Sequence, residues 1–253
     1  MTASFRKLAL VSAISAAFAL PAALQAAPTQ VSLGGVLYAT TSEYRDTDTV
    51  FYPLPALTVE SDHFWMHGVA GGVYLFKNEA HSVRLGLGWM PMFFDPDDSD
   101  DARMKTLKKR DTSMAASVGY RWTSRFGIVD ASVHVDVLGK SDGVLMIGSY
   151  RYPVRLGDLT LVPFTTITWA SENFNSYYYG VSNAESRRSG FNAYSPDAAV
   201  TPAFGMDVDY SLGANWSLFG TASATLIPSE VKDSPMVEDD VKWLVGAGVR
   251  YNF

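Results

Sequence analysis

Alternation of apolar and polar residues with a period of two is the feature that most constrains the fold of this chain. In VDASVHVDV the odd positions from Val129 to Val137 are all apolar, and the even positions are Asp130, Ser132, His134 and Asp136. Successive side chains of a β-strand point to opposite faces, so this segment is predicted to be a strand with one apolar and one polar face. The same pattern recurs in VRLGLGW, SMAASVGYRW, VTPAFGMDVDYSL and VKWLVGAGVRYNF. The sequence therefore predicts an all-β protein.

The length of these segments and the position of their aromatic residues favour a transmembrane barrel. Strands of about ten residues are long enough to cross a bilayer at a tilt. Aromatic residues recur near the strand ends, as they do in the girdles of outer-membrane barrels, at Trp89, Trp122, Tyr210, Trp216, Trp243 and Tyr251. Beyond the N-terminal region, no apolar run is long enough for a membrane-spanning helix. We expect a transmembrane antiparallel up-and-down β-barrel, with an exported β-sandwich as the weaker alternative.

Turn residues divide the chain into about twelve strands, with ten as the alternative. The expected ranges are 30–40, 51–60, 63–76, 81–92, 112–122, 125–138, 143–155, 158–170, 175–182, 197–212, 215–227 and 241–253. The range 175–182 is the weakest, because it could belong to a long loop from Glu172 to Ser195. An even strand number puts both termini in the periplasm, and strict alternation of twelve strands then puts Asp95–Arg110 there as well. Long loops of such barrels usually lie outside, so the side of this segment stays open.

The two ends of the chain carry signals for export and for assembly. Arg6 and Lys7, the apolar run Leu8–Leu20 and the small residues that follow predict a signal peptide over residues 1–26. Residues 27–253 then form one outer-membrane barrel domain. At the other end, the alternating Val249, Tyr251 and Phe253 are similar to the segment that the barrel assembly machinery recognises. We expect this last strand to pair with the first and close the barrel.

Cysteine content and charge exclude several classes of function. The chain has no cysteine, which rules out disulfides, thiol catalysis and Cys-bound metal. Its formal net charge is −6, which makes nucleic acid an unsuitable partner. No phosphate-binding glycine loop is present, and we expect no cofactor.

The polar faces of the strands predict a charged lumen rather than a catalytic site. The candidate lumen cluster comprises Arg84, Arg121, Asp130, His134, Asp136, Arg151, Asp207, Asp209 and Arg250. Arginine and aspartate on the same barrel face are expected to form ion pairs. Ser132, His134 and Asp136 share one face and contain the residue types of a catalytic triad, but any polar lumen supplies such residues. We therefore predict that the protein is not an enzyme.

Two further clusters have the composition, but not the spacing, of metal sites. DPDDSDD, which begins at Asp95, is rich in carboxylates but lacks the ligand order of an EF-hand loop. We interpret it as a solvated acidic loop. With the basic KTLKKR after it, the segment is a charge-segregated hairpin that could pair with itself or with a partner. His63 and His67 lie four residues apart, a spacing at which side chains on a strand do not meet. We expect no metal site.

Several segments resemble the MltA-interacting protein (MipA/OmpV) family of Gram-negative outer membranes. They are YPLPALTVESDHFW, YYYGVS with the NAESRRSGFNAYSPDAA that follows it, DYSLGANWSLFG, IPSEVKDSPMV and VGAGVRYNF, and the similarity extends over about residues 30–253. The resemblance implies an outer-membrane β-barrel without catalytic residues, surrounded by outer-membrane lipid. It also implies a scaffold that links a lytic murein transglycosylase with a penicillin-binding murein synthase. The alternative is a narrow diffusion channel or a porin-like protein of osmotic or antibiotic responses.

Overall fold

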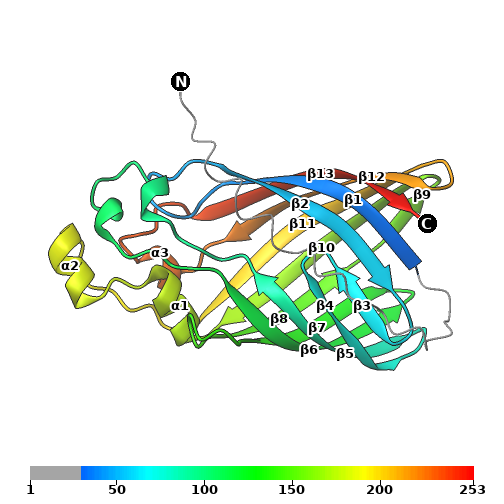
Figure 1. Ribbon diagram of the computed structural model, residues 1–253, viewed down its shortest axis with the longest axis horizontal. Coiled ribbons are helices and arrows are strands. Elements are labelled where there is room, and N and C mark those ends of the chain that lie inside the picture. The colour runs from blue at the N-terminus through cyan, green and yellow to red at the C-terminus, as the bar shows by residue number, and fades with distance from the viewer. Residues whose placement is uncertain (1–29) are drawn as a thin grey trace.

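The structure, a computed structural model, describes residues 30–253, so the predicted signal peptide lies outside the described residues. The described chain forms one antiparallel sheet closed into a barrel (Figure 1). Its strands are β1 Gln30–Thr40, β2 Val50–Glu60, β3 Phe64–His67, β4 Ala70–Lys77, β5 His81–Met90, β6 Ser113–Ser124, β7 Gly127–Asp136, β8 Val144–Arg151, β9 Val154–Leu156, β10 Leu159–Ala170, β11 Ala199–Leu212, β12 Trp216–Leu226 and β13 Val241–Asn252. Three α-helices and two short 3₁₀ helices lie in the connections: α1 Glu172–Tyr179, α2 Asn183–Ser189, α3 Ser229–Lys232, η2 Pro96–Asp98 and η3 Met104–Thr106.

The wall of the barrel has twelve strands, as predicted. β8 and β9 pair with successive residues of β10, so together they act as one strand. The last strand pairs with the first, from Ser32 opposite Asn252 to Thr40 opposite Leu244. This pairing satisfies the backbone groups of both strands and removes the edge that an open sheet would expose.

Two of the predicted strands are wrong, and their errors cancel in the strand number. The range 63–76 is a hairpin, β3 and β4, that turns at Gly68, whose φ of 56° suits glycine. The range 175–182 is mostly α1, which begins after Ser171, whose hydroxyl accepts a hydrogen bond from the N–H of Phe174. The additional turn reverses the chain once before β5. It therefore changes the side on which Asp95–Arg110 lies.

All long connections lie at one end of the barrel, and the C-terminus lies at the other (Figure 1). The long connections are residues 41–49, 91–112, 137–143, 171–198 and 227–240, and we call them together the outer cap. The connections at the other end, 61–63, 78–80, 125–126, 157–158 and 213–215, have two or three residues each. Short periplasmic turns and long external loops are the rule for such barrels, so we name the two ends outer and periplasmic. Asp95–Arg110 belongs to the outer cap, which corrects its periplasmic placement by strict alternation.

The outer cap contains the main buried core of the molecule. Phe94, Met104, Tyr178, Val181 and Met236 are almost fully buried there. Isolated β-bridges join distant parts of the cap, such as Tyr44 with Val237 and Thr47 with Ser99. The connections are therefore packed against one another as a compact layer.

The strand faces follow the predicted alternation. On β1 and β7, odd-numbered side chains such as Leu33, Leu37 and Val135 are exposed on the outside of the barrel. Aromatic side chains on this outer surface form two girdles. Phe51, Trp89, Trp169 and Trp243 lie near the outer end, and Tyr120, Trp122, Tyr150, Tyr210, Trp216 and Tyr251 near the periplasmic end. Within residues 30–253, no helix is long and apolar enough to cross a membrane.

Candidate functional site: the lumen and the outer cap

One group of lumen charges spans three adjacent strands. Asp130 on β7 accepts hydrogen bonds from Arg121 Nε at 2.9 Å and from Arg84 Nη2 at 3.2 Å. The Arg84 guanidinium also lies 5.4 Å from the ring of Trp65 on β3. Because one carboxylate serves two arginines, this part of the lumen keeps net positive charge.

Two further ion pairs lie on the wall formed by β8 to β13. Arg151 pairs with Asp207, and Arg250 pairs with Asp209. Each of these arginines also stacks on a phenylalanine: the guanidinium carbon of Arg151 lies 4.9 Å from the ring of Phe164, and that of Arg250 lies 5.1 Å from the ring of Phe219. Each cation is thus held between a carboxylate and an aromatic face, which fixes its position across the lumen.

His134 and Asp136, the remaining members of the predicted cluster, do not join these ion pairs. His134 Nε2 contacts the Ser132 hydroxyl at 2.9 Å. Asp136 lies at the outer end of β7, where its carboxylate accepts hydrogen bonds from the hydroxyls of Ser113 and Ser141 and from the Ser141 N–H. The carboxylate that would orient the histidine of a triad is therefore engaged in holding the 137–143 connection.

Sequence reasoning missed a fourth polar group, on β2 to β4. Glu60 accepts hydrogen bonds from Tyr74 Oη and Lys77 Nζ, both at 2.6 Å, and its second oxygen lies 3.3 Å from His67 Nε2. These residues come together only because the chain turns at Gly68. The glycines at 68, 71 and 72 were the available sequence signal of a hairpin.

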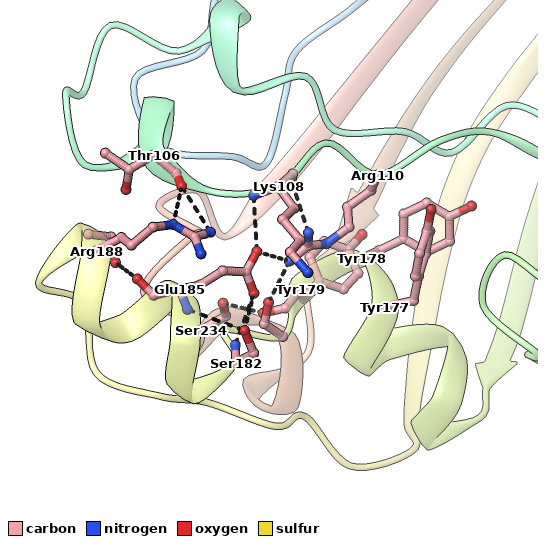
Figure 2. Close-up of polar contacts among 12 residues, drawn as sticks. Thr106, Lys108, Arg110, Tyr177, Tyr178, Tyr179, Ser182, Glu185, Arg188 and Ser234 are labelled. Carbon is pink, nitrogen blue, oxygen red and sulfur yellow. Dashed lines mark hydrogen bonds and ion pairs between the residues drawn. The ribbon is translucent and has the colours of Figure 1, made fainter.

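Glu185 is the centre of the polar contacts in the outer cap (Figure 2). Its carboxylate accepts hydrogen bonds from the N–H of Lys108 at 3.0 Å, from Arg110 Nη2 at 2.8 Å and from the Ser182 hydroxyl at 2.7 Å. Burial acts to raise the pKa of Glu185, but these hydrogen bonds outweigh it and lower the pKa to about 2. A surface cleft of about 670 Å³ adjoins Glu185 and Arg110, and Lys108, Lys109, Tyr177 and Tyr194 are among the residues that line it.

A second buried carboxylate joins the cap to the barrel. Glu43 is 2% exposed and pairs with Lys242 at the start of β13, while Tyr179 Oη donates a hydrogen bond to it at 2.8 Å. Burial acts to raise the pKa of Glu43, but the Lys242 ammonium and the hydrogen bonds outweigh it, so the pKa is lowered. The hydroxyl of Ser234 also donates to the carbonyl of Tyr179 at 2.6 Å. These contacts join the connections of Glu43, Tyr179 and Ser234 to one another and to Lys242 of β13.

Helix α1 lies over the outer end of the barrel, where it contacts β8. Lumen-facing residues at the outer ends of β5, β6, β10 and β11 are buried in the same apolar cluster as Phe174 and Tyr178 of α1; they are Met90, Ala115, Ala170 and Ala199. A mouth open to water on this side would leave these side chains exposed. Apolar packing of the cap therefore covers the outer end at these four strands.

The acidic segment pairs with itself, as its charge pattern indicates. Asp95 pairs with Lys109 at 3.0 Å and Asp101 with Arg103 at 2.6 Å, above the bridge that joins Phe94 to Arg110. In the part of the chain that the structure describes, no group of three or more His, Asp or Glu side chains is arranged to hold a metal ion.

Comparison with known proteins assigns this barrel to a family. The family profile described as "MltA-interacting protein MipA" matches residues 33–253. The chain is 34% identical over 241 residues to the MltA-interacting protein of Escherichia coli K12, covering 95% of this chain and 97% of the relative. It is 34% identical over 240 residues to the putative outer membrane protein YiaT of the same organism, covering 95% of this chain and 98% of that relative. It is 28% identical over 180 residues to the outer membrane protein OmpV of Vibrio cholerae, covering 70% of this chain and 69% of that relative. The chain therefore belongs to the MltA-interacting protein MipA family and is an outer-membrane β-barrel.

Proposed function

We propose that this protein is a non-enzymatic scaffold that binds a lytic murein transglycosylase at its periplasmic end. The observation that carries the proposal is the similarity to the MltA-interacting protein, which extends over 95% of this chain and 97% of that relative. Following the family resemblance, the scaffold brings the transglycosylase together with a penicillin-binding murein synthase.

The shape of the barrel limits where such enzymes bind. Murein enzymes act in the periplasm, and the periplasmic end offers the strand ends and five short turns. The charged segment Asp95–Arg110 lies in the outer cap and cannot serve as their docking surface. The covered outer mouth also favours a scaffold over a diffusion channel.

The β6–β7 turn is the strongest candidate anchor among the periplasmic turns. Phe126 is 63% exposed there, and the guanidinium of Arg125 lies 4.6 Å from its ring. The hydroxyl of Tyr150 donates to the carbonyl of Phe126 and so holds the turn in place. Aromatic and arginine side chains in fixed positions are the residues that most often dominate protein interfaces.

The test uses the purified full chain in lipid nanodiscs and a purified lytic transglycosylase. We expect the double variant Arg125→Ser, Phe126→Ser to weaken binding at least about tenfold, the loss of one interface anchor of about 1.4 kcal/mol or more. The matched control is Arg103→Ser with Lys105→Ser in the outer cap, which should bind as the wild type does. Absence of binding by the wild-type protein, together with absence of transglycosylase and synthase from crosslinks in intact cells, would refute the proposal.

A further inference from the structure

The barrel wall is incomplete next to the outer half of β2. Only Thr58, Val59 and Glu60 of β2 pair with β3, because the β3–β4 hairpin turns back at Gly68. The N–H of Gly68 donates to the carbonyl of Leu57 at 2.7 Å, and the N–H of Trp89 donates to the carbonyl of Val69 at 3.2 Å. Beyond these bonds, no strand within residues 30–253 pairs with β2 on this side.

We call this region the wall gap. It is bounded by residues 51–56 of β2, by the turn at Gly68, by the end of β5, and by the contact of Tyr52 with Phe93, whose ring centroids lie 6.3 Å apart. By ideal sheet spacing, the width of two strands leaves about 14 Å between the backbone of β2 and that of residues 90–93, and side chains fill part of this space.

The edge of β2 that faces the wall gap presents carbonyl groups almost alone. In an antiparallel strand, alternate residues direct both backbone groups to the same side, and Leu57 directs its carbonyl away from β1. Phe51, Pro53 and Pro55 have the same parity, so their backbone groups also face the gap, where within residues 30–253 they make no backbone hydrogen bond. Proline has no N–H, so only Phe51 supplies a donor.

This edge is unsuited to pairing with another strand. A strand added at the gap would lose half of its ladder hydrogen bonds at Pro53 and Pro55, and prolines on an edge are a known protection against such pairing. A second copy or an extended peptide is therefore a poor occupant. The free carbonyls instead require hydroxyl or amide donors, because an unpaired backbone group within a bilayer is strongly unfavourable.

The lumen face of β2 is apolar over the same rows. Tyr52, Leu54 and Ala56 face the lumen, on the same side as Glu60 and opposite the exposed Phe51, Pro53 and Pro55. Leu54 lies beside Val36 of β1, which is buried. Since the other lumen walls carry ion pairs, an apolar row behind an opening in the wall is suited to a hydrocarbon chain.

The depth of the wall gap determines the source of that chain. Phe51 and Trp89 belong to the outer aromatic girdle, and the rows 53–56 lie on its membrane side. We propose that the wall gap admits the hydrocarbon chain of an outer-leaflet amphiphile, which lies against Leu54 and Ala56 while donors of its linkage region bind the carbonyls of Pro53 and Pro55. This site is independent of the proposed scaffold role, which uses the periplasmic turns.

The absence of cysteine permits a direct test by single-cysteine labelling. The variant Leu54→Cys is labelled with bimane and reconstituted into phosphatidylcholine vesicles with and without bromine on the acyl chains. Two variants serve as references. Leu37→Cys lies on the lipid face of β1, and Ser223→Cys lies on the lumen face of β12, which pairs with a strand on each side. We expect bromine to quench Leu54→Cys to an extent close to Leu37→Cys. Quenching no greater than at Ser223→Cys would overturn the proposal.

A replacement variant and a competition with a second lipid complete the test. Ala56→Cys replaces Leu54→Cys if the latter fails to show the heat-dependent gel mobility of a folded barrel. Unbrominated sphingomyelin, which carries amide and hydroxyl donors, should relieve the quenching more than the same amount of unbrominated phosphatidylcholine. Equal relief would overturn the role of the Pro53 and Pro55 carbonyls.

Discussion

Replacing Glu185 by alanine should loosen the outer cap while leaving the barrel folded. Glu185 is 2% exposed, and its carboxylate is the partner of the buried Arg110 guanidinium. It also completes the capping box of α2 with Ser182. The variant therefore leaves the Arg110 charge with only the carbonyls of Lys108 and Gly180 as acceptors.

Two routes give a similar size for the effect. A pKa lowered from 4.5 to about 2 corresponds to about 3 kcal/mol of stabilisation of the ionised carboxylate. Breaking a buried ion pair by removing one partner typically costs about 3–5 kcal/mol. Because the folded-state pKa is the lower one, this stabilisation is fully present above pH 4.5 and is lost as the pH falls towards 2.

Hydrogen exchange in the cap measures this loss at neutral pH. The N–H of Val181 and that of Tyr194 bond to each other's carbonyls at 2.8 and 2.9 Å, and neither of these bonds involves Glu185. Their exchange reports the opening of the α1–α2 segment. We expect about a hundredfold faster exchange at these two amides in Glu185→Ala, the equivalent of about 3 kcal/mol.

A matched variant separates charge pairing from general damage. Glu172→Ala removes a carboxylate from the first turn of α1 that forms no ion pair with another residue of the range 30–253, and it should change exchange at Val181 and Tyr194 little. Amides of the barrel strands should be unaffected in both variants. Wild-type exchange at Val181 and Tyr194 in Glu185→Ala would refute the reasoning, because it would mean that the Glu185 contacts contribute nothing to the closed cap.

Two further outcomes are expected. Phe253→Asp places a charge beside Tyr251, whose ring lies 5.0 Å from that of Phe253 and 5.1 Å from that of Trp216. We propose that this substitution lowers the outer-membrane level of the protein without affecting export. An unchanged level would contradict the role of this strand in assembly. In planar bilayers the purified protein should show no conductance, because the cap core that includes α1 covers the outer mouth. Deletion of residues 172–195 should produce conductance. Steady conductance of the full chain would instead support the channel alternative.

The sequence predicts the barrel well because the period of two is imposed on almost every strand by lipid on one side. VDASVHVDV is β7 with its polar residues inside, and the last strand closes on the first as expected. That arginine and aspartate side chains meet in the lumen follows from the same periodicity, since only side chains of one parity point there. Which arginine meets which aspartate depends on the register between strands, and this could not be read from one sequence.

One failure lies in the outer cap, where no lipid enforces the alternation, and the other lies at a turn within the barrel wall. SYYYG in the 175–182 range has strand-forming residues, but α1 packs these aromatic side chains into the cap core, where Tyr178 is fully buried. The β3–β4 hairpin was missed because Val69, Ala70 and the glycines around its turn continue an apolar pattern. In both places tertiary packing outweighs local preference.

The two ends of the barrel differ in the kind of interaction they can support. The outer cap has its own core and two buried carboxylates, Glu43 and Glu185, whose hydrogen bonds join residues far apart in the chain. Its buried groups are already paired, so binding there would use its surface without rearranging its core. The periplasmic end has turns of a few residues, fixed by the strands that they connect. A scaffold needs presented side chains that cost little to hold in place, and Phe126, ordered by Tyr150 and Arg125, meets that requirement. The functional surface is therefore expected where the loops are shortest, the reverse of the usual association of function with long loops.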